Sequence, residues 1–120
     1  MYQDPMESCD LLMVASLLRQ KPHAAARFTG SRRAPILQGI VRLYPMPRGI
    51  LLAVEVDRLP EGARFDLIIE GGLPLPSMVS VRGRVLQVMV VGACTVEDLM
   101  GRRVTIEREG EVLGKGTIQP

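Results

Sequence analysis

Carboxylates at the ends of alternating segments are the side chains of this chain that could most readily carry chemistry. Glu70 ends the alternation in "RFDLIIEGG", and Glu107 ends it in "RRVTIE". Two carboxylates that meet in a pocket could act as acid and base. With Glu109, they could also supply oxygen ligands, which suit Ca²⁺ or Mg²⁺ rather than copper. We favour a third interpretation, that these carboxylates are simply solvated, because strand ends are exposed to water.

A metal centre or nucleophile built on histidine or cysteine is not expected. His23 is the only histidine, and Cys9 and Cys94 lie far from each other in the sequence. Zinc sites usually take four ligands, mostly from closely spaced Cys and His residues. The chain also contains no phosphate-binding loop and no nucleophile-elbow motif.

The composition predicts one folded cytoplasmic domain that binds neither nucleic acid nor membrane. Hydrophobic residues make up 47% of the 120 residues and charged residues 23%, which is typical of a chain that folds around a core. Aromatic residues make up 3% and the net charge is +2, so a base-stacking surface is not expected. The apolar run at 11–18 is too short for a membrane span, and acidic rather than basic residues precede it. The two cysteines form no disulfide framework, which is typical of a reducing compartment.

The first element that the pattern predicts is a short helix. Apolar residues between Cys9 and Gln20 fall at helical spacing, and Pro22 follows its end. A helix of about 12 residues is marginal alone, so it must lie on another part of the molecule or on a partner. We therefore divide the chain into an N-terminal segment, 1–21, and a β domain, 22–120.

After the helix the period changes to two, which is typical of strands separated by Gly- and Pro-rich breaks. Strands are predicted at His23–Thr29, Ile36–Tyr44, Ile50–Asp57, Arg64–Glu70, Arg84–Val91, Arg102–Glu107 and Lys115–Gln119. The segment Arg84–Val91 is the most apolar, and we expect it to be central. Seven or eight short strands without alternating helices predict an all-β fold, an antiparallel β-sandwich or flattened barrel.

The segment "TVEDLMGR" interrupts the strand pattern and predicts a single helical turn. Thr95 is a suitable N-cap, and Asp98 stands three residues later, as in a capping box. Gly101 would close the turn in the left-handed conformation that glycine adopts readily.

Taken in order, these segments resemble the copper–zinc superoxide dismutase family, in its bacterial form. The resemblance is carried by "LQGIVRLY", "GILLAVEVDRLPEG", "FDLIIEGG", "LPSMVSVRG" and "CTVEDLMGRRVTIE". The last segment is the most specific, because the family reads "TVEDIIGRTVIIH" there. The resemblance covers roughly residues 22–119 and implies a Greek-key β-sandwich.

The same resemblance implies that the family's metal site has been lost. Aligning "FDLIIEGG" with the family's "GFHIHEGG" puts Leu67 and Ile69 where two copper histidines stand. Glu107 replaces the final copper histidine, and Pro74 falls about where the zinc aspartate would be. Copper that changes oxidation state needs imidazole ligands, and aliphatic side chains have no lone pairs. We therefore expect no cofactor and no dismutase activity.

These observations predict a non-catalytic, metal-free superoxide dismutase-like domain, a pseudoenzyme that serves as a structural or protein-interaction module. Loss of the family's long loops would uncover surface around Glu70, Leu73, Leu75 and Met78, where a second copy or another protein could bind. The N-terminal helix could cover this surface instead. Two alternatives stay open: an enzyme of another class that uses Glu70 with Glu107, and a weak metal binder with oxygen ligands.

Overall fold

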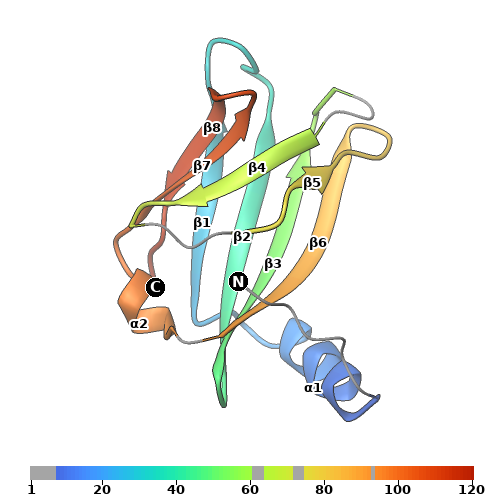
Figure 1. The fold of residues 1–120 in the computed structure, drawn as a ribbon, viewed down its shortest axis with the longest axis vertical. Coiled ribbons are helices and arrows are strands. Elements are labelled where there is room, and N and C mark those ends of the chain that lie inside the picture. Colours follow the sequence, from blue (N-terminus) through green and yellow to red (C-terminus); the bar gives the residue numbers. More distant parts are fainter. Residues whose placement is uncertain (1–7, 61–63, 72–74, 93) are drawn as a thin grey trace.

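Eight antiparallel strands form a nearly closed barrel in the computed structural model, which describes residues 8–60, 64–71, 75–92 and 94–120 (Figure 1). The elements are α1 (Ser8–Leu18), β1 (Ala24–Gly30), β2 (Gln38–Met46), β3 (Gly49–Asp57), β4 (Arg64–Ile69), β5 (Met78–Val79), β6 (Arg84–Gly92), α2 (Val96–Leu99), β7 (Arg103–Arg108) and β8 (Glu111–Thr117). Figure 1 shows β4 crossing in front of β1, β2 and β3, so the sheet folds over into two layers.

The strand order gives the barrel its Greek-key connectivity. The strands pair in the order β5-β4-β7-β8-β1-β2-β3-β6, and β5 lies against β6. Around the barrel, β4, β5 and β6 are therefore neighbours, whereas β3 lies beside β6 instead of β4. The all-β fold with a short N-terminal helix, predicted from the period-two segments, is confirmed.

The predicted strand bounds agree with the structure to within a residue or two, except for the last strand. β8 begins at Glu111, well before the predicted start at Lys115. Glu109 and Gly110 have φ values of 53° and 80° and form a two-residue turn that places Arg108 opposite Glu111. Such a turn joins two antiparallel strands directly, so β8 has to begin immediately after it.

β6 is not the central strand that its apolar sequence predicted. It stands at one end of the strand order and is paired along its length with β3. Both of its faces carry packed apolar side chains, since Met89 and Val91 lie in the barrel core while Val88 and Val90 are partly buried against a second cluster outside it. An apolar run therefore reports side-chain burial here and not the number of neighbouring strands.

One aliphatic core fills the barrel. Its largest fully buried side chains include Phe65, Leu43, Ile50 and Leu52, and each such side chain contributes about 1.5–3 kcal/mol to stability. Ser80 is the single buried polar residue of the described ranges, and its hydroxyl donates to the Pro60 carbonyl. No buried side-chain N or O atom in these ranges lacks a hydrogen-bond partner.

The helix α1 packs on the outer face of its own barrel. Val14 is buried against Tyr44, Leu51 and Ala53, which project from β2 and β3 away from the core. This contact explains why these strands carry apolar residues on both faces. Neither helix in the described part of the chain has the length and apolar content needed to cross a membrane.

The predicted capping box is confirmed at α2. Thr95 Oγ1 accepts a hydrogen bond from the Asp98 N–H at 3.2 Å, and Asp98 Oδ2 accepts one from the Thr95 N–H at 3.0 Å. Gly101 follows with φ of 82°, as expected for a residue that closes a helix. The turn thereby leads directly into β7.

The turn between β5 and β6 predicts a stabilising substitution. Arg82 and Gly83 have φ values of 56° and 74°, and Val81 and Arg84 exchange backbone hydrogen bonds across them. A side chain in the left-handed region costs about 1–2 kcal/mol, and asparagine tolerates it best. Arg82→Asn should therefore raise the free energy of unfolding, measured by urea titration, by about 1 kcal/mol.

The matched control is Arg103→Asn, which removes an exposed arginine from a strand residue outside the left-handed region. This variant should show no gain in stability. Equal gains in the two variants would contradict the turn as the cause.

Candidate functional site

The residues aligned with the family's copper histidines lie inside the barrel. Leu67 and Ile69 are 3% and 1% exposed and belong to the core, whereas Asp66 and Ile68 alternate with them on the outer face of β4. Inward imidazoles at these positions would need polar partners, and aliphatic side chains pack there instead. Pro74, the position aligned with the zinc aspartate, lies outside the described residues.

The structure does not bring Glu70 and Glu107 together. Glu107 stands opposite Asp66 in the β4–β7 pair, whereas the Glu70 N–H donates to the Arg103 carbonyl at the other end of β7. An extended strand from residue 66 to residue 70 spans roughly 13 Å. Glu107 instead accepts a hydrogen bond from the Thr105 hydroxyl at 3.0 Å. Among the described residues, no three Asp, Glu, His or Cys side chains lie close enough to hold a metal ion.

The expected apolar binding surface requires a correction. Met78 is 1% exposed because β5 places it opposite Phe65 and directs it into the barrel, and Leu75 is half-buried against the same core. Met78 therefore stabilises the fold and cannot form an exposed patch, and Leu75 leaves only part of its surface exposed. Glu70 is exposed, and its carbonyl accepts a hydrogen bond from Arg102 at 3.1 Å. Leu73 lies outside the described residues.

His23 and Cys94 occupy structural positions. His23 Nε2 lies 3.1 Å from Glu97 Oε1 on the exposed surface, where it links the start of β1 to α2. Burial raises the pKa of the Cys94 thiol, and the nearby Asp98 carboxylate raises it further. A thiol with a raised pKa stays protonated at neutral pH and is a poor nucleophile.

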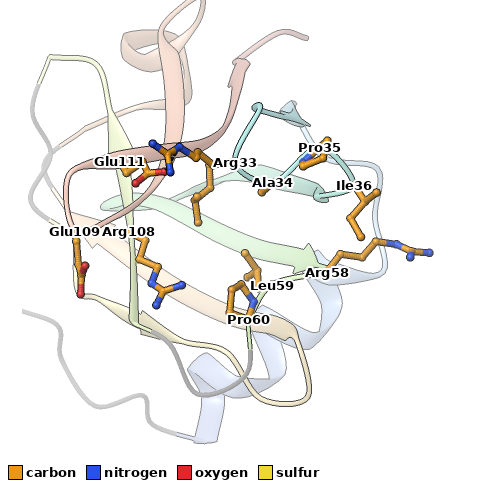
Figure 2. A pocket seen from close by; sticks show the side chains of 11 residues that line it. Arg33, Ala34, Pro35, Ile36, Arg58, Leu59, Pro60, Arg108, Glu109 and Glu111 are labelled. Carbon is orange, nitrogen blue, oxygen red and sulfur yellow. Dashed lines mark ion pairs between the residues drawn. The ribbon is translucent and has the colours of Figure 1, made fainter.

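A hollow of about 930 Å³ lies at the end of the barrel where three connections meet, and we call it the loop-end hollow (Figure 2). The connections are β1–β2, β3–β4 and the tight turn β7–β8. Its lining residues are Arg33, Ala34, Pro35, Ile36, Arg58, Leu59, Pro60, Arg108, Glu109, Glu111 and Leu113. The walls are thus mainly apolar, with charged side chains from all three connections.

Two arginines of the loop-end hollow have no carboxylate partner within the described ranges. Arg33 Nε pairs with Glu111 Oε1 at 2.9 Å, but Arg58 and Arg108 form no ion pair there. Figure 2 shows the Arg108 side chain pointing toward Pro60, while Arg58 extends away from the other labelled side chains. A guanidinium can bind a carboxylate through two parallel hydrogen bonds. The hollow can therefore receive an apolar group that carries a negative charge.

In the sequence, these three segments stand between predicted strands and indicate no binding site by themselves. Each break nevertheless contains an arginine, in "GSRRAP", "RLPEGA" and "EREGEV". These arginines indicate a shared binding site only once the strand order is known, because the strand order places the three segments at one end of the barrel.

No protein-family model matches the chain, and no curated protein matches it either.

The burial of Leu67 predicts that a histidine cannot be introduced there without loss of stability. Leu67→His should lower the free energy of unfolding by about 3 kcal/mol, because it replaces a packed side chain with an imidazole that lacks partners. Urea titration with and without added copper measures the effect. The control, Ile68→His, changes a side chain that is 43% exposed on the same strand and should cost less than about 0.5 kcal/mol. Rescue of Leu67→His by copper would contradict the assignment.

Proposed function

We propose that the chain is a metal-free, non-catalytic domain, related in design to copper–zinc superoxide dismutase, that serves in the cytoplasm as a protein-interaction module. The observation that carries the proposal is the loop-end hollow, in which apolar walls meet Arg108, an arginine that pairs with no carboxylate among the described residues. A partner would dock there through a segment that offers an apolar side chain next to a carboxylate.

A non-catalytic role is supported by the positions of the side chains that could have acted as metal ligands, acid–base groups or nucleophile. Leu67 and Ile69 offer no ligand atoms, and the Glu70 and Glu107 carboxylates belong to opposite ends of a strand pair. The Cys94 thiol is held in its protonated form. The paired-carboxylate enzyme and the oxygen-ligand metal binder therefore have less support than a binding domain.

The charges of the loop-end hollow narrow the class of ligand. Arg108, which points toward Pro60 across the hollow (Figure 2), favours an anionic group, since Arg–carboxylate pairs are strong and directional. Glu109 and the Arg33–Glu111 ion pair stand at the same hollow, and their carboxylates would repel a ligand with many negative charges. A peptide with one or two carboxylates between apolar residues fits better than a polyanion such as nucleic acid.

Elemental analysis of protein purified without chelator tests the metal-free part of the proposal. We expect no stoichiometric copper or zinc, and we expect EDTA to leave the melting temperature unchanged, because metal removal destabilises only folds that bind metal. A one-to-one copper or zinc site whose removal lowers the melting temperature would contradict this part.

Charge reversal at Arg108 tests the loop-end hollow. The probe is a capped peptide of alternating leucine and glutamate, and its binding is followed by chemical-shift changes of the hollow residues. Arg108→Glu should weaken binding at least roughly tenfold, because it replaces an attractive charge with a repulsive one.

The control for this experiment is Arg103→Glu, which makes the same charge change at the opposite end of β7. It should leave binding unchanged. Equal weakening by both variants would mean that the peptide responds to net charge and not to the hollow.

A further inference from the structure

In the part of the chain that the structure describes, β6 presents a backbone edge that is unpaired over most of its length. The Arg84 N–H donates to the Val81 carbonyl at 3.1 Å, and the Val81 N–H donates to the Arg84 carbonyl at 2.8 Å. Arg84 thus directs both backbone groups away from β3. These groups alternate between the two sides of a strand, so Leu86, Val88 and Val90 direct theirs to the same side as Arg84. Within the described residues, no backbone hydrogen bond reaches these three residues on that side.

The β6 edge also lacks the features that usually keep sheet edges apart. The segment Val85–Gly92 contains no charged residue and no proline. Leu86 is 64% exposed on the outer face. Natural edge strands commonly carry charges, prolines or bulges, and an edge without them pairs readily with another strand.

We propose that the β6 edge pairs with the β6 edge of a second copy of the chain, antiparallel and around a two-fold axis. The pairing extends the β1-β2-β3-β6 layer across both copies. An antiparallel strand pair is compatible with a two-fold axis, in which the same patch serves both partners. The loop-end hollow lies on other elements, so this dimer does not depend on peptide binding there.

The sequence of β6 is complementary to itself in the antiparallel register centred on Val88. Val88 then stands opposite Val88 of the second copy and Leu86 opposite Val90, while Arg84 lies outside the paired segment because its backbone groups are bonded to Val81. Apolar side chains meet along the seam, and no like charges face each other. Arg84 is moreover compensated within its own chain, since its Nε lies 2.6 Å from Asp57 Oδ1. A second copy therefore supplies hydrogen-bond partners for the free backbone groups of β6 and covers the exposed side chain of Leu86.

Sedimentation velocity and amide hydrogen exchange on the full chain test the proposal without any substitution. We expect a monomer–dimer equilibrium that shifts with concentration. Exchange at Leu86, Val88 and Val90 should slow as the dimer forms, because their N–H groups become hydrogen-bonded. A monomer at all concentrations with fast exchange at these amides overturns the proposal, as does protection of the edge only after another protein is added.

Leu86→Pro tests the edge specifically. The Leu86 N–H is not bonded to β3 and its side chain is exposed, and proline is tolerated on edge strands where its missing N–H would face solvent. We expect a folded monomer by circular dichroism and a dimer dissociation constant raised at least roughly tenfold, since each copy loses a hydrogen bond and an apolar contact.

The matched control is Ile68→Ser, which removes an exposed apolar side chain from the other layer. It should leave the dissociation constant unchanged. A dimer that survives Leu86→Pro, or that is lost in Ile68→Ser, would place the interface elsewhere and overturn the proposal.

Discussion

Burial of a single aliphatic core, shared by two layers of strands, is the constraint on which the rest of this barrel depends. β4 contributes Phe65, Leu67 and Ile69, and β3 contributes Ile50 and Leu52 from the opposite layer. Because side chains alternate along each strand, the inward set must be apolar throughout, and an imidazole in it would need a polar partner. The β4 positions that the resemblance assigns to copper ligands are therefore occupied by residues that the core requires.

The core of the barrel is well buried, but the ring of hydrogen-bonded strands is not closed between β5 and β6 in the described residues. β5 has two residues, and it pairs Met78 and Val79 with Phe65 and Arg64 of β4. β6 is longer and pairs with β3 along its whole length. A short strand beside a long one cannot satisfy the long strand's second edge. Within the described residues, the shortness of β5 therefore leaves the middle of β6 with free backbone groups, although its inward side chains are well packed.

Local features of this fold could be predicted from the sequence, because they depend on nearby residues. Period-two segments between Gly- and Pro-rich breaks gave most strand bounds, and Thr95 with Asp98 gave the capping box of α2. The position of β6 could not be predicted in this way. Its apolar residues serve the core on one face and the α1-covered cluster on the other, and neither contact reveals which strands are hydrogen-bonded to it. The loop-end hollow was missed for a related reason, since its arginines come from segments that meet only after the strands have paired.

The apolar outer face of β6 is explained only in part by α1. Val88 and Val90 belong to the cluster beneath the helix, together with Val14 and Leu51. Leu86 lies on the same face but outside that cluster, and it is 64% exposed. An apolar side chain next to free backbone groups is the combination that a further strand would use, and the unpaired edge of a second copy supplies such a strand.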